Sequence, residues 1–429
     1  MTELRTIDVT ELTRVEGEGA LKVALEGDQI KTLEFNIFES PRFFEAFLRN
    51  RSYMEVPDIT ARICGICPVA YQTSSANAIE DALKIQVSPE IRDMRRLLYM
   101  GEYIESHALH VYLLHAPDFL GYPSGIAMAA DFPNEVKDAL RLKKIGNAMM
   151  TLVGGREIHP INPRVGGFWK AISKADLRAM IPDLEWALDA AIATTKLVAT
   201  FNFPDLDPDY EFVAIHDPAE YAVIDGTIKS TRGIDAPLSQ WGEIFEEEHV
   251  GRTNALHCRT KARGSYQVGP TARVNINFEQ LHPKALQVAS EVGIRPPVTN
   301  PFKSIITRSI EMVHAAATML DIIDSYTPPA PPYVEATEES GEGFGASEAP
   351  RGTLFHHYRI NQGLVETAQI VPPTSQNQLR IEEDLRQLIP TQLHLDDKAL
   401  GHVLEQAIRN YDPCISCATH FVDLQIDRG

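Results

Sequence analysis

The chain has 429 residues, of which 44% are hydrophobic and 23% are charged, as in ordinary globular proteins and unlike disordered or fibrous ones. Its formal net charge of −19 would repel polyanions, which argues against nucleic acid or an anionic membrane surface as the main partner. The amino terminus lacks a basic segment followed by an apolar one, and no apolar run reaches the roughly eighteen residues of a membrane span. We therefore expect a cytoplasmic protein.

Apolar residues alternate on both sides of Gly27-Asp28, which predicts a β-hairpin near the amino terminus. Farther along, apolar residues recur at helical spacing over 89–115, and similar long helices are expected at about 175–200 and 302–326. The prolines within 328–332 cannot continue a helix, so they predict an extended connector.

The carboxyl-terminal part is predicted to be less regular. Residues 340–378 are rich in glycine, proline and threonine, which indicates irregular chain with short strands such as 369–371. A final helix is expected at about 396–410. Within this part, GEGFGAS at 341–347 superficially resembles a phosphate-binding loop, but it does not lead into a helix, so we do not predict a nucleotide site there.

These elements indicate a mainly α-helical fold with a minor β component: a core of long helices, an N-terminal β-hairpin and peripheral short strands. No repeat of fixed period and no sharp change of composition marks a boundary, so we expect a single domain over residues 1–429. Its expected parts are the hairpin with a first cysteine pair (1–75), a helical body (76–327), a region with a second cysteine pair (333–420) and a tail (421–429).

The cysteines carry the strongest chemical signal. Four of the five form two C-x-x-C pairs, Cys64 with Cys67 and Cys414 with Cys417, while Cys258 stands alone and is interpreted as structural. Thiolates at this spacing can share one metal and select zinc, nickel, copper(I) or iron–sulfur species. Structural zinc is the usual interpretation of two such pairs at short separation. Here 347 positions separate the pairs, which suits a reactive metal deep in the fold better.

The sequences around the pairs, RICGICPVAY and YDPCISCATH, resemble the two nickel-binding motifs of nickel-iron hydrogenase large subunits. Further segments resemble the same family in the same order, so the resemblance covers nearly the whole chain. These segments are TRVEGEG, GREIHPINPRVGG (155–167), SYQVGPTARVN (265–275) and EAPRGTLFH (348–356). The resemblance implies the catalytic subunit of a hydrogenase, an enzyme that cleaves H2 reversibly and heterolytically into protons and electrons.

The resemblance also implies roles for the cysteines and for one carboxylate. Cys64 and Cys414 would be terminal ligands of nickel, and Cys67 and Cys417 would bridge nickel to an iron that carries one carbon monoxide and two cyanides. Glu16 matches the family's glutamate that exchanges a proton with the sulfur corresponding to Cys414.

Three further residues are implied to surround the metals. Arg351 matches an arginine whose guanidinium would hydrogen-bond a cyanide, and Asp412 looks like the acid that orients it. Pro373 falls where relatives often have a serine or threonine bonded to a cyanide, so the neighbouring Thr374 is the candidate for that bond.

A second metal is implied near the carboxyl terminus. Glu45, His420 and a backbone carbonyl near Gln369 resemble the ligands of a structural magnesium ion, and magnesium prefers oxygen ligands. The alternative, that Glu45 is a solvated helix residue, stays open.

Some positions depart from the commoner family pattern. Tyr71 stands where many relatives have histidine, and Ser106 stands where they have the aspartate of an H-D-H motif. With the short chain, these differences most resemble the cytosolic, bidirectional subgroup linked to NAD(P) or ferredoxin. The family commonly carries a tail that is removed after nickel insertion, and the sequence leaves open whether 421–429 is retained.

Partners follow from the cysteine count. Cys258 alone cannot hold an iron–sulfur cluster, so electrons must leave through another chain. The resemblance implies an iron–sulfur small subunit, flavin- and iron–sulfur-containing diaphorase or ferredoxin-linked subunits, and maturation factors, with an endopeptidase for the tail. Three alternatives stay open: a hydrogen-sensing regulatory homologue with low turnover, a non-catalytic relative from respiratory complex I, and a structural zinc protein.

Overall fold

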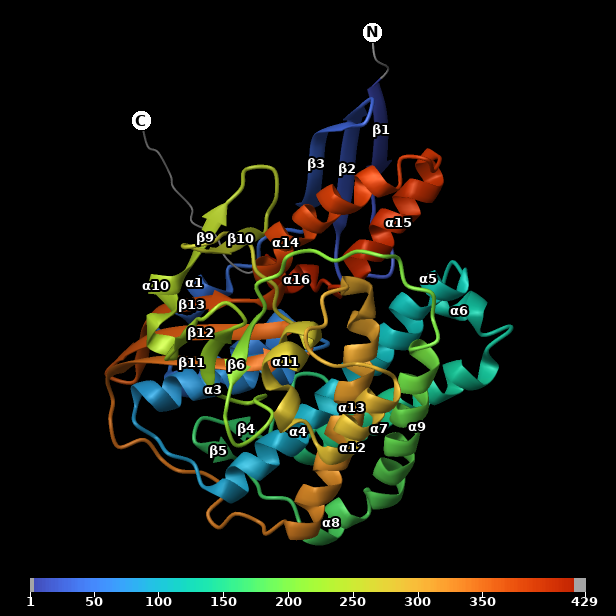
Figure 1. Cartoon of the computed structure of the whole chain (residues 1–429). Coiled ribbons are helices and arrows are strands. Elements are labelled where there is room, and N and C mark those ends of the chain that lie inside the picture. The colour runs from blue at the N-terminus through green and yellow to red at the C-terminus, as the bar shows by residue number, and fades with distance from the viewer. Residues whose placement is uncertain (1–3, 420–429) are drawn as a thin grey trace, which may run out of the picture.

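The structure is a computed structural model and describes residues 4–419. Long helices form the body of the protein (Figure 1). They are α3 (Pro68–Ala82), α4 (Pro89–Ala108), α7 (Pro133–Gly154), α9 (Ile181–Val198) and α13 (Ser304–Ser325). Helix α4 lies in their midst, packed against α7 and α13. The sheets are small, with two or three strands each. The predicted class, mainly α with a minor β component, is confirmed.

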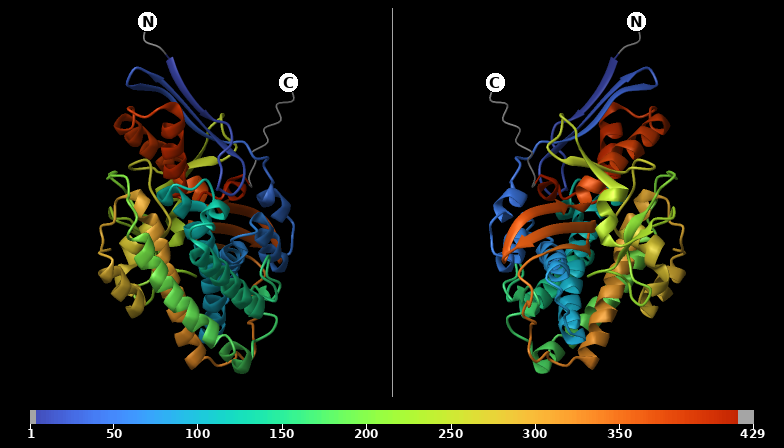
Figure 2. Two further views of the ribbon diagram at one scale, coloured as in Figure 1. Left: turned by 90° about the vertical axis from the view of Figure 1, so that its right-hand side faces the viewer. Right: turned by 90° about the vertical axis from the view of Figure 1, so that its left-hand side faces the viewer.

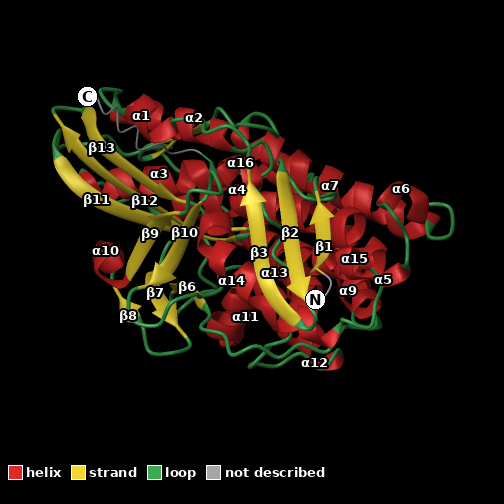
Figure 3. Ribbon diagram, turned by 90° about the horizontal axis from the view of Figure 1, so that it is seen from above, coloured by secondary structure: helices red, strands yellow, loops and turns green. Residues whose placement is uncertain are grey.

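The N-terminal hairpin is also confirmed. Strands β2 (Gly19–Glu26) and β3 (Gln29–Ile37) pair antiparallel around Gly27, and β1 (Leu4–Val9) adds a third strand on the other side of β2. Its apolar side chains are buried against α14 (Pro373–Leu388) and α15 (Asp397–Arg409). Seen from above, the three strands lie across these helices (Figure 3). The N-terminal strands are therefore held by the C-terminal helices, and α15 confirms the helix expected at 396–410.

The other predicted helices are confirmed with changes at their ends. Helix α4 ends at Ala108 and continues as a π-helix over Leu109–His115. The helix expected at 302–326 is α13, and no helix or strand follows it through the Pro-rich connector. The helix expected at 175–200 is divided into α8 (Lys174–Arg178) and α9, because Pro182 in the first turn of α9 cannot donate to a continuing helix.

The prediction of irregular chain over 340–378 is wrong. This segment forms three long antiparallel strands, β11 (Gly341–Ala349), β12 (Gly352–Asn361) and β13 (Leu364–Val371), and the start of α14. Strand β11 includes GEGFGAS and packs directly on α3, as the side views show (Figure 2). The glycines that suggested irregular chain permit this contact. A Cβ at Gly343 would lie 2.2 Å from the carbonyl oxygen of Ala78, far inside van der Waals distance.

The remaining elements are short. The strands are β4 (Pro163–Arg164), β5 (Gly167–Phe168), β6 (Val213–His216), β7 (Thr227–Ser230), β8 (Asp235–Ala236), β9 (Phe245–His249) and β10 (Leu256–Thr260). The helices are α1 (Phe44–Leu48), α2 (Val56–Thr60), α5 (Ala116–Leu120), α6 (Gly125–Met128), α10 (Trp241–Ile244), α11 (Pro270–Asn277), α12 (Pro283–Glu291) and α16 (Ile415–Ala418). Within residues 4–419, none of the helices combines the length and the apolar composition that a membrane crossing requires.

The contact between β11 and α3 gives a stability prediction. Gly343→Ala is expected to lower the free energy of unfolding by about 2 kcal/mol or more, because the new methyl group meets helix backbone that cannot rotate away. Scanning calorimetry of the purified chain measures this. Gly242→Ala is the control, since a Cβ at this helical glycine meets nothing within 4 Å. Equal unfolding temperatures for the two variants would contradict the close packing.

Candidate metal centre

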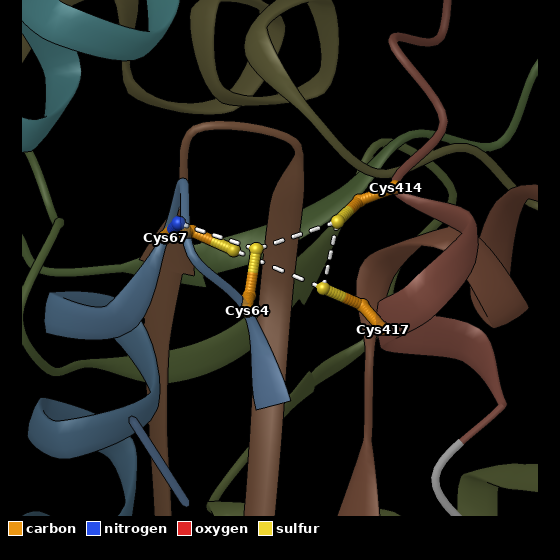
Figure 4. Close-up of side chains that lie close together, drawn as sticks. All are labelled: Cys64, Cys67, Cys414 and Cys417. Carbon is orange, nitrogen blue, oxygen red and sulfur yellow. Dashed lines mark hydrogen bonds between the residues drawn. The ribbon is translucent and has the colours of Figure 1, made fainter. Parts of the chain in front are cut away.

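The fold brings the two distant cysteine pairs together. The four Sγ atoms of Cys64, Cys67, Cys414 and Cys417 all lie within 4.8 Å of one another, and all four side chains are buried. The Sγ atoms of Cys64 and Cys414 are 3.5 Å apart, and those of Cys67 and Cys417 are 3.9 Å apart. Figure 4 shows the four side chains converging from the start of α3 on one side and from α16 on the other.

The first pair has a backbone arrangement suited to a thiolate. The backbone N–H groups of Ile66 and Cys67 both donate to the Cys64 Sγ, each at 3.3 Å. Hydrogen bonds from the neighbouring cysteine thiols hold the pKa of Cys64 well below its usual range. Cys67 is the N-cap of α3, but its side chain does not cap the helix. Both sulfur atoms are therefore directed to the cluster.

The second pair is held by Glu16, from the loop before β2. The Glu16 carbonyl accepts the N–H of Ile415 at 3.0 Å, and its Oε2 accepts the N–H of Ser416 at 2.9 Å. The Cys414 Sγ donates to the same Oε2 at 3.3 Å, and the Cys414 N–H donates to Thr374 Oγ1 at 3.0 Å. The structure thus brings Glu16 and Thr374 into direct contact with Cys414.

A buried ion-pair cluster fixes the loop that carries Glu16. Asp118 at α5 pairs with Arg14, two residues before Glu16, and with Arg409 of α15 at 3.0 Å. Arg409 also donates to the carbonyl oxygen of Thr13 at 2.9 Å. This loop cannot shift without breaking buried charge-assisted hydrogen bonds.

Arg351 lies in the turn between β11 and β12 and is almost fully buried. Its Nε donates to the Asp412 carbonyl at 2.8 Å, and its Nη2 donates to Asp412 Oδ1 at 3.2 Å. Burial works against the charged guanidinium, but the negative charges of Asp412 and the cysteine thiolates raise the Arg351 pKa well above its ordinary value. Arg351 Nη1 has no hydrogen-bond partner among residues 4–419. The arginine and the acid predicted to orient it are therefore in contact.

Sequence analysis missed a buried charge network behind Arg351. Arg273 of α11 donates to Glu311 of α13 at 2.6 Å and to Glu348 of β11 at 3.0 Å. His107 of α4 bonds to the same Glu311 at 2.8 Å. The available signal was Glu311 on the mostly apolar helix α13, which also carries Arg308 and His314, since an ionised side chain among apolar residues needs a buried partner.

The two departures from the commoner pattern lie on buried surfaces. Tyr71 packs edge-on against His356 with ring centroids 5.9 Å apart. Burial and the charges of Cys417 and Cys67 hold the Tyr71 pKa well above its usual range. Ser106 is buried on α4, and its hydroxyl has no hydrogen-bond partner in the described part of the chain.

The structure places two of the three residues predicted to bind the second metal, Glu45 and Gln369, next to each other. Glu45 of α1 accepts the backbone N–H of Ile370 at 2.7 Å, next to Gln369. The Gln369 side chain donates to Glu247 at 3.0 Å, and sequence analysis did not single out Glu247. Burial raises the pKa of each carboxyl group to about 7, and for Glu247 the charge of Glu45 adds to this effect. His420 lies outside the described residues.

The donor set of the cysteine cluster fits a soft metal. Four buried sulfur atoms that all lie within 4.8 Å of one another suit nickel or zinc, and hard cations are disfavoured. The unpartnered Nη1 of Arg351 beside the thiolates offers a donor to a further acceptor in the same pocket. Fold and site together define a mainly helical protein with a buried four-cysteine site suited to a soft metal.

Comparison with known proteins gives the family. Residues 42–137 and 261–420 match the family model for nickel-dependent hydrogenases. The chain is 33% identical to sulfhydrogenase 1 subunit alpha of Pyrococcus furiosus over 97% of its own length and 98% of the relative. The chain belongs to the nickel-dependent hydrogenase family, as the resemblance predicted. It is therefore a subunit of a hydrogenase, an oxidoreductase that acts on H2.

Two further similarities refine the picture. The chain is 27% identical to the NAD-reducing hydrogenase HoxS subunit beta of Cupriavidus necator, over 97% of this chain and 95% of the relative. The solved structure of an NAD+-reducing [NiFe]-hydrogenase in the H2-reduced state matches with a TM-score of 0.86 and 26% identity, over 97% of this chain and 99% of the other. A [NiFeSe]-hydrogenase of Desulfomicrobium baculatum shares the fold, with a TM-score of 0.76 at 22% identity and coverage of 97% and 100%.

The neighbouring carboxyl groups of Glu45 and Glu247 give a pH prediction for the metal-free chain. Both folded-state pKa values lie above the ordinary 4.5, so the stability that protonation contributes is fully present below pH 4.5 and is lost as pH rises through about 7. For Glu247 this loss amounts to as much as ~3 kcal/mol.

The unfolding temperature of the metal-free chain, measured between pH 5.5 and 8, is expected to fall with increasing pH, and Glu247→Gln is expected to reduce that fall. These two pH values are about 1 to 1.5 units on either side of the raised pKa. Glu243→Gln, at an exposed position of α10, is the control. An unchanged slope in Glu247→Gln would contradict the raised pKa.

Proposed function

We propose that the four cysteines hold a nickel–iron centre whose iron carries one carbon monoxide and two cyanides, with Cys64 and Cys414 terminal and Cys67 and Cys417 bridging. The observation that carries this proposal is the buried cluster of four Sγ atoms with Glu16 in contact with one of them and Arg351 beside them. When bound, this centre supplies the place at which H2 is cleaved reversibly into protons and electrons.

The residues of this chain handle the proton. Glu16 Oε2 is 3.3 Å from the Cys414 Sγ, which is within reach for direct proton exchange. The N–H of Ser416 holds the same oxygen in place, and the Ser416 hydroxyl lies between Glu16 Oε1 and, at 2.8 Å, Glu39 Oε1. Its single hydrogen can be donated to either carboxylate in turn. Glu39 is half-buried, next to the exposed Phe38. We therefore propose that protons travel from Cys414 through Glu16 and Ser416 to Glu39.

Arg351 and Thr374 shape the pocket. The fixed guanidinium places its unpartnered Nη1 where it can donate to a cyanide on the iron, and Asp412 prevents it from turning away. Thr374 already accepts the Cys414 N–H, so its hydroxyl hydrogen remains available for a second acceptor.

Electrons are proposed to leave through an iron–sulfur small subunit that covers the first cysteine pair. Gly65, between the two cysteines, is exposed, and His159 is hydrogen-bonded to the backbone of Cys64. Three apolar side chains close to His159 in the sequence are more than half exposed: Ile158, Ile161 and Trp169. An apolar surface beside a buried redox centre suits a permanent partner.

The wider assembly follows from the relatives. Because the similar Cupriavidus necator protein is a subunit of an NAD-reducing hydrogenase, we propose onward transfer to flavin- and iron–sulfur-containing diaphorase or ferredoxin-linked subunits in the cytoplasm. Nickel insertion would require maturation factors, with an endopeptidase for residues 421–429. The cysteine pairs come from opposite ends of the chain, which supports a single domain over residues 1–429.

We also propose a magnesium ion bound by Glu45, the Gln369 carbonyl and His420. Two neighbouring carboxyl groups, Glu45 and Glu247, support a divalent cation there, because the ion would stabilise both in their charged forms. Added Mg²⁺ would then reverse the loss of stability of the metal-free chain above pH 7.

The nickel–iron centre is tested by elemental analysis and infrared spectroscopy of the purified complex. Nickel, iron and bands of metal-bound carbon monoxide and cyanide are expected, and Cys64→Ser is expected to lose them. Cys258→Ser is the matched control, because this buried cysteine lies in β10, outside the cluster. Zinc without such bands would exclude the proposed centre.

The proton route predicts the behaviour of Glu16→Gln. This variant is expected to keep its nickel and iron but to lose about 10²–10⁴-fold in H2 oxidation, because the amide cannot accept the proton from Cys414. Hydrogen uptake with an artificial electron acceptor measures the loss. Glu11→Gln, at an exposed position of the same loop, is expected to retain wild-type activity. Wild-type turnover in Glu16→Gln would remove Glu16 from the route.

A further inference from the structure

Helix α3 begins directly after Cys67 and lacks a cap from its own sequence. The first turn of any helix leaves backbone N–H groups without a partner inside the helix. Cys67 is the N-cap residue, but its side chain accepts no hydrogen bond from the first turn. Pro68 occupies the first helical position and has no N–H, so the N–H groups of Val69 and Ala70 need an acceptor from elsewhere.

Glu102 of α4 supplies that acceptor. Its Oε2 accepts the N–H of Val69 at 2.7 Å, and its Oε1 accepts the N–H of Ala70 at 3.2 Å. The side chain of Glu102 is completely buried. Both oxygen atoms of one carboxylate are therefore used to complete the first turn of a helix that belongs to another segment of the chain.

The position of this carboxylate has a cost. Burial raises the Glu102 pKa well above its ordinary value, and the hydrogen bonds from Val69 and Ala70 and the charge of Arg351 act in the opposite direction. A serine or asparagine as N-cap would accept one of the same N–H groups without a buried carboxylate. That solution is not open to α3, because the N-cap side chain is the Cys67 thiol, which is directed to the other sulfur atoms.

The first turn of α3 controls both sulfur atoms of the first pair. Cys67 is the N-cap residue of this turn, so the position of its Sγ depends on the turn. The Cys67 N–H also donates to the Cys64 Sγ at 3.3 Å. A rotation of this turn would therefore displace one ligand and remove a hydrogen bond from the other.

We propose that Glu102 is a positioning residue of the metal centre, which caps α3 from α4 so that the Cys67 thiolate is free for the metal and both sulfurs of the first pair are correctly oriented. This inference rests on the proposed function, in which Cys64 and Cys67 are metal ligands. The Glu102 side chain makes no hydrogen bond to the four cysteines. Its role is therefore to position the metal ligands rather than to bind the metals.

Glu102→Gln tests the proposal in the complete complex with the iron–sulfur partner. The amide has nearly the same size, but its NH2 group cannot accept, so one backbone N–H of the first turn loses its acceptor and faces another donor. The expected results are a shift of the infrared bands of the iron-bound diatomic ligands and at least a twofold loss of nickel per chain.

Glu80→Gln is the matched control. Glu80 is also buried, accepts the backbone N–H of Gly166 at 2.7 Å and pairs with Arg95 at 2.5 Å. It lies on α3 itself, but near the C-terminal end of that helix and away from Cys67 at its N-terminus. This variant is expected to lower the unfolding temperature while its infrared bands and nickel content stay those of the wild type.

The outcomes separate this proposal from the proposed function. Wild-type complex without infrared bands would count against the nickel–iron centre itself. Wild-type bands with an unchanged Glu102→Gln variant would overturn the positioning role alone. If Glu102→Gln yields no folded complex, Glu102→Asp decides: its shorter carboxylate is expected to shift the bands, and wild-type bands in that variant would also overturn the role.

Discussion

The site depends on holding four sulfur atoms close together in a pocket from which water is largely excluded. Thiolates so placed repel one another and have lost their hydration, so the fold must provide positive charge and hydrogen-bond donors. Arg351 provides the nearby charge, and the N–H groups of Ile66 and Cys67 provide donors to Cys64. A soft metal ion supplies the remaining positive charge when it is bound.

The same requirement explains how the ends of the chain are joined. The second cysteine pair is attached to the N-terminal loop through backbone and side-chain bonds of Glu16, so the ligands and the proton acceptor are fixed as one unit. Tyr411, next to Asp412, donates to the buried Asp384 of α14 at 2.5 Å, and Arg380 donates to the same carboxylate. The C-terminal segment is thus held from both sides.

Buried charges elsewhere serve to hold Arg351. Arg273 donates to the carbonyl oxygens of Ala349 at 2.8 Å and Pro350 at 3.0 Å, the two residues before Arg351 in the turn. Glu311 and Glu348 balance the charge of Arg273. Removing one member of such a network leaves an unpaired buried charge, which costs about 3–5 kcal/mol. The geometry of the pocket is therefore coupled to the core of the helical body.

The sequence alone determined the family, the fold class, the hairpin at Gly27 and the helices whose apolar spacing is strong, because these depend on local pattern and on motifs such as the two C-x-x-C pairs. It did not determine β11, β12 and β13. The glycines of β11 are needed because any Cβ there would clash with the backbone of α3, which is more than 250 residues away in the sequence. The tertiary structure also decided which buried groups meet. Glu102, Glu247 and Glu311 are ordinary glutamates in the sequence, and each acquires its role from partners on other elements. Local spacing cannot encode such contacts, because they form only when distant segments are packed together.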